Sequence, residues 1–505
     1  MQLLLCTAVL FSIFLLVTRY NRRNRLSLPP GPLGLPLIGN LLDMTKSQQW
    51  RGISEWREKY GDIVYLRVFG KSFVYLRNAE VATDLLHSRG SIYSDRPHLT
   101  MAGEMCGMKN LVPLTRYGPR FRQERKLMSS VLSNSAVGVW KPAIMKENAI
   151  LLRSMLETPA DYSLHIRRMA GSLALSAMYG YQAQGGDDPY VKGAEEFMRV
   201  SSDTMTRGWL VDFIPLLKHI PMTTWRTVSA HVRAQVEAWV DRPNTMFKNL
   251  PNTTEKVSSF CGQLLLDENG RLANLDAEES VKWMALSIYG GMSQTYYTVA
   301  TISQMILAMV HHPDVVKKAH TELDEVVGQH RLPTFDDQNR LPYIDCILRE
   351  TLRWGTPVPL SPPHVLMEQD EYLGYTLPEG SYVIPRAIMH DTRVFSDPQK
   401  FYPERFEEVV DPELGKLRDP LNYVFGFGRR RCPGVHFAMQ SIWYTIATFL
   451  TCFDISPIVG EDNVPALPAL EFEDGVFRHP KPFRFRLSPR GPLAEDLIHK
   501  SSSLL

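Results

Sequence analysis

Cysteine is scarce in this chain, and so is any excess of charge of one sign. The six cysteines among 505 residues stand at positions 6, 106, 261, 346, 432 and 452, with no CxxC and no short spacing. This pattern excludes a zinc-ligand set and a disulfide framework, so we expect a mainly reduced body that faces the cytosol. With 56 basic and 54 acidic residues, the formal net charge is +2 and no basic domain stands out. Nucleic-acid binding through bulk charge is therefore not expected.

The sequence also lacks internal repeats, low-complexity stretches and long linkers. A hydrophobic content of 44% and a charged content of 22% indicate a globular protein with ample core and exclude wholesale disorder. Although a chain this long would ordinarily hold about three domains, nothing divides residues 41–505, which we interpret as one large domain. The patterns predict a mainly α fold with small β-sheets, whose strands lie at Ile63–Phe69, Phe73–Leu76 and around Tyr372–Ile384.

The N-terminal segment is apolar and is followed by positive charge. Met1–Thr18 carries no charged residue, and arginines follow at positions 19, 22, 23 and 25. A cleaved signal peptide carries its positive charge before the apolar stretch, so this order favours a signal anchor. An interfacial helix would need a charged face, which is lacking here. We expect residues 1–18 to form a single transmembrane helix with everything downstream in the cytosol, and residues 19–40 to form a basic and proline-rich hinge.

A glycine-punctuated loop in the C-terminal third surrounds one cysteine. Cys432 follows three arginines and precedes a helix expected from Val435 to about Leu450. A thiolate in this position is stabilised by the helix N-terminus and by nearby guanidinium groups. A lone cysteine is more often a small buried hydrophobe, but the ten residues around it favour a ligand.

The loop resembles the haem-binding loop of the cytochrome P-450 family, which has the form Phe-x-x-Gly-x-Arg-x-Cys-x-Gly. The matching residues are Phe425, Gly428, Arg430, Cys432 and Gly434. The resemblance implies the cytochrome P-450 fold and haem b (iron protoporphyrin IX) as the cofactor, with Cys432 as the axial thiolate ligand of the iron. It also implies that Arg430 pairs with a haem propionate, and that Phe425 and Gly434 belong to the cofactor site.

Two further motifs follow the order expected from that resemblance. The helix predicted at Leu341–Trp354 carries Glu350 and Arg353 three residues apart on one face. Such a pair on its own is typical of a solvated surface salt bridge. Arg405, in the Pro-Glu-Arg-Phe stretch at 403–406, completes the family's pattern. The resemblance implies a buried structural triad that supports the haem loop, without a role in the chemistry.

A long helix is predicted from about Ala277 to His311. Its middle, Tyr289–Tyr296, holds two glycines, which are explained either by close helix packing or by similarity to the family's oxygen-binding helix. In the second interpretation Thr295 matches the threonine that assists proton delivery. Gln294 stands where the family has an acid, and an amide cannot relay a proton as a carboxyl group does. Either a chain of water molecules on Thr295 suffices for proton delivery, or the enzyme carries out less ordinary haem-thiolate chemistry.

Two more residues are assigned to the cofactor by the resemblance. Arg125 matches the arginine of the family's Trp-x-x-x-Arg, although Phe121 replaces the tryptophan. A solvated helix face is the alternative for an arginine in this arginine-rich run. His364, after two prolines, resembles a residue on the propionate side.

The resemblance covers nearly the whole chain and is closest to membrane-bound fungal members of natural-product pathways or of xenobiotic oxidation. It implies a haem-thiolate monooxygenase of the endoplasmic reticulum membrane that inserts one atom of O2 into a small lipophilic substrate. Electrons would come from NADPH through NADPH–cytochrome P-450 reductase, because the chain has no complete nicotinamide or flavin fingerprint of its own. By the same analogy, substrate would meet the segments 99–114, 197–217, 289–296, 357–362 and 474–478.

Two rival functions stay open at this point. Gln294 motivates a haem-thiolate enzyme that does not oxygenate, such as a dehydratase, an isomerase or a coupling catalyst. The other rival is a non-catalytic, membrane-anchored haem protein, against which the presence of Thr295 argues.

Overall fold

A computed structural model describes residues 27–44, 56, 58–184, 188–221, 223–292, 297–359, 361–385, 388–460, 464–473 and 478–503. The anchor predicted at residues 1–18 and the first part of the predicted hinge lie outside these ranges. Across the ranges given, we find no helix with the length and apolar character that a membrane crossing requires.

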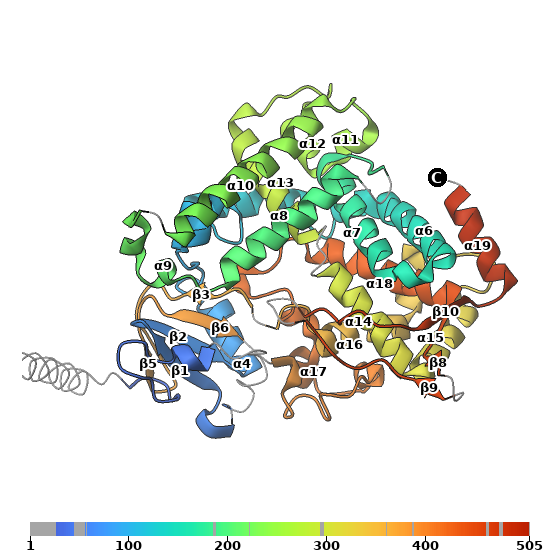
Figure 1. Ribbon diagram of the computed structural model, residues 1–505. Coiled ribbons are helices and arrows are strands. Elements are labelled where there is room, and N and C mark those ends of the chain that lie inside the picture. Colours follow the sequence, from blue (N-terminus) through green and yellow to red (C-terminus); the bar gives the residue numbers. More distant parts are fainter. Residues whose placement is uncertain are drawn as a thin grey trace, which may run out of the picture.

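The chain is mainly helical with small sheets, as predicted (Figure 1). The α-helices are α2 (Leu41–Met44), α4 (Ala79–Thr83), α5 (Pro119–Leu132), α6 (Lys141–Glu157), α7 (Tyr162–Tyr179), α8 (Pro189–Thr206), α9 (Leu210–Phe213), α10 (Thr224–Asn249), α11 (Thr254–Ser258), α12 (Phe260–Leu265), α13 (Leu275–Met292), α14 (Thr298–His311), α15 (Pro313–Val326), α16 (Pro342–Gly355), α17 (Pro412–Arg418), α18 (Val435–Cys452) and α19 (Pro492–Ser503).

The largest sheet has the strand order β1-β2-β6-β3, and three two-stranded sheets accompany it. The strands are β1 (Ile63–Val68), β2 (Lys71–Leu76), β3 (His364–Val365), β4 (Asp370–Tyr372), β5 (Tyr375–Leu377), β6 (Tyr382–Pro385), β7 (Phe453–Ser456), β8 (Ile458–Val459), β9 (Pro465–Ala466) and β10 (Arg486–Pro489). Phe69 and Gly70, both with positive φ, make the tight turn between β1 and β2, as a two-residue hairpin requires. The predicted strand positions are confirmed.

Helix prediction succeeded for two elements and failed for one. The helices predicted around Leu341–Trp354 and from Val435 are α16 and α18. The single helix predicted from Ala277 to His311 is wrong, because α13 ends at Met292 and Tyr297 lies in a turn before α14 begins. The two glycines near the end of α13 weaken helix propagation there. Gln294 and Thr295 stand between the two helices, outside the described residues.

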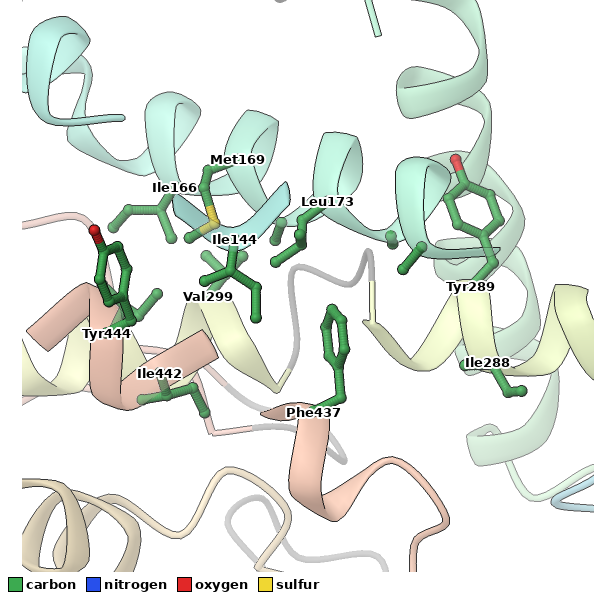
Figure 2. Close-up of a cluster of buried hydrophobic side chains, with 14 of the residues drawn as sticks. Ile144, Ile166, Met169, Leu173, Ile288, Tyr289, Val299, Phe437, Ile442 and Tyr444 are labelled. Carbon is green, nitrogen blue, oxygen red and sulfur yellow. The ribbon is translucent and has the colours of Figure 1, made fainter. Parts of the chain in front are cut away.

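The main core lies among the long helices, and it fixes α18. Every residue of α14 from Val299 to Val310 is buried, and α14 packs against α16 and α18. Figure 2 shows Val299 of α14 and Phe437 of α18 in one apolar cluster; the cluster also includes Ile144, Ile166, Met169, Leu173, Ile442 and Tyr444. Because α18 is anchored in this way, the loop that precedes it is held at a rigid helix end.

Candidate active site

The loop before α18 presents Cys432. The main-chain N–H of Cys432 donates to the Phe425 carbonyl oxygen at 2.7 Å, which closes the loop. Gly428 has φ +49°, and a Cβ there would lie 2.2 Å from the carbonyl oxygen of Leu86. Only glycine allows the loop to pack this closely against the segment around Leu86. The cysteine is therefore held at a defined position, with Gly434 leading directly into α18.

The thiol of Cys432 is accessible, whereas the thiols of the other described cysteines, at positions 106, 261, 346 and 452, are buried. Desolvation raises the pKa of Cys432, while the Gly434 N–H and the positive charges of Arg125 and Arg431 oppose that rise. Accessibility combined with desolvation is expected of a side chain that faces an internal space. Coordination to a metal deprotonates such a thiol outright.

Arg430 is buried two residues before Cys432. Its Nε donates to the carbonyl oxygen of Ser94 and its Nη2 to that of Thr115, each at 2.7 Å. The Phe121 ring centroid lies 3.7 Å from the guanidinium carbon, so the residue in the family's tryptophan position stacks on this arginine. Among the residues described, Nη1 has no hydrogen-bond partner. Burial and the charges of Arg96 and Arg125 lower the pKa of Arg430 to about 9.

Arg96 is a second buried cation, which the sequence analysis did not assign to the site. Its Nη1 donates to the carbonyl oxygens of Pro362 and Pro363, each at 2.7 Å. Its Nε lacks a partner within the described ranges, and desolvation lowers its pKa to about 10. Arg96 could not be assigned to the site from the sequence, because its hydrogen bonds join segments that lie far apart in the chain.

His364 and Arg125 lie near these cations. His364 is buried and its Nδ1 lies 2.7 Å from the Tyr93 carbonyl oxygen. Burial and the charges of Arg96 and Arg430 hold the pKa of His364 well below its ordinary value. Burial also lowers the pKa of Arg125, and Cys432 is the group close enough to oppose that shift.

Within the described part of the chain, these cations make no ion pair with a carboxylate. Ion pairs between described residues do not include Arg96, Arg125 or Arg430. Uncompensated buried charge is costly, and guanidinium groups match carboxylates through paired hydrogen bonds. The orphaned nitrogens of Arg96 and Arg430 therefore fit the two propionates of a haem, and the accessible thiol fits its iron.

The three residues of the predicted triad meet in the structure. Arg353 Nε and Nη2 donate to the two carboxylate oxygens of Glu350 at 2.7 and 2.8 Å, and Arg405 Nε donates to Glu350 Oε2 at 3.1 Å. The side chains of Glu350 and Arg353 are 0% exposed, and that of Arg405 is 3% exposed. Arg353 also donates to the carbonyl oxygens of Met389 and Pro398. The cluster thus ties α16 to the segment 389–405.

Tyr297 is the first described residue after Gln294 and Thr295, which lie outside the described ranges. Its carbonyl oxygen accepts from the N–H of Thr301 at 2.9 Å and from the Thr301 hydroxyl at 2.7 Å. Desolvation and the nearby Cys432 raise the pKa of its phenol, and Arg96 opposes that rise. The chain before α14 therefore approaches the cysteine loop, and sequence reasoning missed Tyr297.

An accessible thiol just before a helix, among buried cations that make no ion pair within the described part of the chain, fits a haem-thiolate protein. A sequence model of the Cytochrome P-450 family matches residues 29–487. The cytochrome P-450 monooxygenase claT of Ampulloclitocybe clavipes is 45% identical over 502 residues, covering 99% of each chain. The monooxygenase claR of the same fungus is 37% identical over 97% of this chain and 91% of its own. Cytochrome P-450 monooxygenase 226 of Postia placenta is 36% identical over 95% of this chain and 91% of its own.

The chain belongs to the cytochrome P-450 family. It is a haem-thiolate monooxygenase, and membership implies a haem-iron cofactor, O2 and a redox partner.

Proposed function

We propose that this monooxygenase contains haem b and oxidises a small lipophilic substrate of secondary metabolism, by hydroxylation or epoxidation. Its electrons come from NADPH through NADPH–cytochrome P-450 reductase. The observation that carries the proposal is the set of buried, unbalanced cations beside the accessible Cys432 thiol. Relatives named as monooxygenases over the whole chain support the reaction class.

Different residues around the thiol would bind different parts of the haem. Cys432 would bind the iron, Arg96, Arg125 and Arg430 would hold the propionates, and Phe425 and Gly434 would shape the loop that carries the thiol. When bound, the haem activates O2 so that one oxygen atom enters the substrate. The protein itself orients the substrate, excludes water and supplies protons.

His364 has a defined role in this arrangement. Its Nδ1–H donates to the Tyr93 carbonyl oxygen, which leaves Nε2 without a proton in the neutral ring. A carboxylate close to an imidazole raises its pKa. A propionate would therefore promote protonation of Nε2 and accept a hydrogen bond from it.

For proton delivery we propose Thr295, with a water held by the Gln294 amide. An amide can donate to and accept from water although it cannot relay a proton itself. Tyr297, near Cys432, adds a phenol on the same stretch of chain.

Membrane attachment belongs to the same proposal: residues 1–18 anchor the chain in the endoplasmic reticulum membrane, with the catalytic domain in the cytosol. The leucines at 33, 37 and 216 are 98%, 94% and 78% exposed. Residues 30 and 40 bond to β1, and Phe213 of α9 lies against Phe69 of the β1–β2 hairpin, so residues 27–44 and α9 both adjoin this hairpin (Figure 1). Deletion of residues 1–18 should move the protein from the membrane pellet toward the supernatant when membranes are sedimented without a carbonate wash. Undiminished pelleting of the shortened protein would contradict the anchor.

The experiment that tests the chemistry uses 18O2. The protein is combined with the reductase, NADPH and a panel of terpene and aromatic probes, and products are weighed by mass spectrometry. Incorporation of one labelled oxygen atom is expected. A product formed without label would support dehydration, isomerisation or coupling instead, and NADPH consumption without any product would indicate uncoupled leakage.

A further inference from the structure

Helix α5 carries an acidic residue on its buried face. The buried residues of this helix are Phe121, Glu124, Met128, Val131 and Leu132, and Glu124 is the charged one among them. Its side chain is 1% exposed. Apolar side chains at this spacing pack a helix onto a core, and glutamate is rarely buried completely unless it is paired. Packing therefore does not explain a carboxylate at this position.

The Glu124 carboxylate is paired on one side. Its Oε1 accepts from Arg120 Nε at 2.8 Å, whereas its buried Oε2 has no hydrogen-bond partner among the residues that the structure describes. The Arg120 side chain is 44% exposed, and its two terminal nitrogens donate to Asn110. Solvent screens an exposed guanidinium group more than a buried carboxylate. The pair therefore leaves a net negative field on the inner side of α5.

This negative charge lies beside the residues assigned to the haem. Phe121, three residues before Glu124 and on the same face of α5, stacks on Arg430 with its ring centroid 3.7 Å from the guanidinium carbon. Arg125, the next residue, is close enough to Cys432 for their charges to interact. Burial is the main cause that lowers the pKa of Arg430, and the charge of Glu124 is among those that oppose it.

A fixed charge at this place acts on electron transfer to the haem. Reduction of the iron from the ferric to the ferrous state takes one electron from the redox partner and adds one negative charge to the site. A buried carboxylate repels that added charge, and the repulsion is stronger in the protein interior than in water. The buried arginines 96, 125 and 430 act in the opposite direction. Glu124 therefore offsets part of their effect.

We propose that the buried Glu124 carboxylate lowers the reduction potential of the haem iron and so counterbalances the arginines assigned to the propionates. The proposal rests on the proposed function in placing the haem between Cys432 and those arginines. A purely structural role for Glu124, as a support for Arg120 and Asn110, would leave the potential unchanged once the shape of the side chain is kept.

The test compares the haem-loaded full chain with Glu124→Gln and Glu124→Asp, and measures the midpoint potential by spectroelectrochemical titration. Glutamine keeps the size of the side chain and an acceptor for Arg120 but removes the charge. At a fixed applied potential the ratio of reduced to oxidised haem should therefore rise about tenfold, which is a shift of about 59 mV for a one-electron couple. Aspartate keeps the charge, so its shift should be smaller.

Glu157→Gln is the matched control. Arg153 and Glu157 on α6 form a pair with the same spacing in the helix and the same distance of 2.8 Å, but both side chains are about half exposed. This substitution should leave the potential unchanged.

Three results would overturn the proposal. The first is a Glu124→Gln variant with the wild-type potential, and the second is an equal rise in the glutamine and aspartate variants, because shape and not charge would then control the potential. The third is loss of haem from Glu124→Gln, seen in the haem-to-protein ratio, because the carboxylate would then serve haem retention. Failure of the proposed function would look different, since the wild type itself would lack a thiolate-ligated haem.

Discussion

Arg430 donates hydrogen bonds to two main-chain carbonyls, and its Nη1 still has no partner among the described residues. A buried guanidinium group with a nitrogen left over is costly unless a further acceptor arrives. A haem propionate is such an acceptor. Arg96, with an orphaned Nε, repeats the pattern.

Replacement of Arg430 should therefore act first on the haem. Arg430→Leu removes charged hydrogen bonds worth about 1.5–3 kcal/mol each and should lower haem affinity by tenfold or more. Arg430→Lys keeps the charge but loses the fork, so its loss should be smaller. The haem-to-protein ratio of purified protein measures both. Arg153→Lys, at an exposed pair with Glu157, is the control, and equal haem content in all four proteins would contradict the assignment.

Gln294 gives a prediction about coupling. If the amide limits proton delivery, Gln294→Asp should raise the amount of product formed per NADPH consumed. Thr295→Ala should lower it, because the hydroxyl that holds the proton-carrying water is lost. Product and peroxide are measured together with NADPH loss. Unchanged or worse coupling in Gln294→Asp would show that the amide suits its own substrate.

Some residues of the site could be predicted from sequence and others could not. Cys432 and Arg430 stand in a compact motif, so their candidacy was visible. Arg96 was not assigned, because its partners Pro362 and Pro363 lie more than 260 positions away. The stacking of Phe121 on Arg430 was missed because these two residues also lie far apart in the sequence. Phe121, which stands where the family has a tryptophan, contacts Arg430 through the face of its ring.

At the scale of elements, α16 depends on the ionic cluster of Glu350, Arg353 and Arg405. Glu350→Gln would leave two buried guanidinium groups without their carboxylate, and breaking such a cluster costs about 3–5 kcal/mol. The urea midpoint of unfolding should fall accordingly. Asp345→Asn on the same helix, whose pair with Arg349 is about one-third exposed, should cost about 1 kcal/mol or less. Equal effects of the two substitutions would contradict a buried structural role.

The elements also show where sequence patterns suffice. The periodicity of α16 and α18 and the alternation of β1 and β2 were strong enough to predict these elements. The helix expected from 277 to 311 was wrong because apolar periodicity continues on both sides of the break. Tyr297 lies in a turn, although the apolar pattern continues on both sides of it.

At the scale of the whole molecule, buried histidines predict acid sensitivity. Burial lowers the pKa of His390 to about 3 and that of His479 to about 4. In an unfolded chain histidine titrates near about 6.5. Above that pH these side chains are neutral in both states. Below it the unfolded chain binds protons that the folded chain does not, so the free energy of unfolding should fall as pH drops from about 6.5 toward 4.

Urea midpoints measured between about pH 7.5 and 4.5 test this prediction. The His390→Gln, His479→Gln double variant should show a shallower decline than the wild type. If the urea midpoints of the double variant and the wild type declined with the same slope, other titrating groups would control the pH dependence of stability.

Cys432 is proposed to bind haem iron as a thiolate, and the carbon-monoxide difference spectrum of the reduced protein tests this assignment. The wild type should give the strongly red-shifted Soret band of a thiolate-ligated haem, and Cys432→Ser should lose it. A wild type that contains haem but lacks this band, or a serine variant that keeps it, would contradict the assignment.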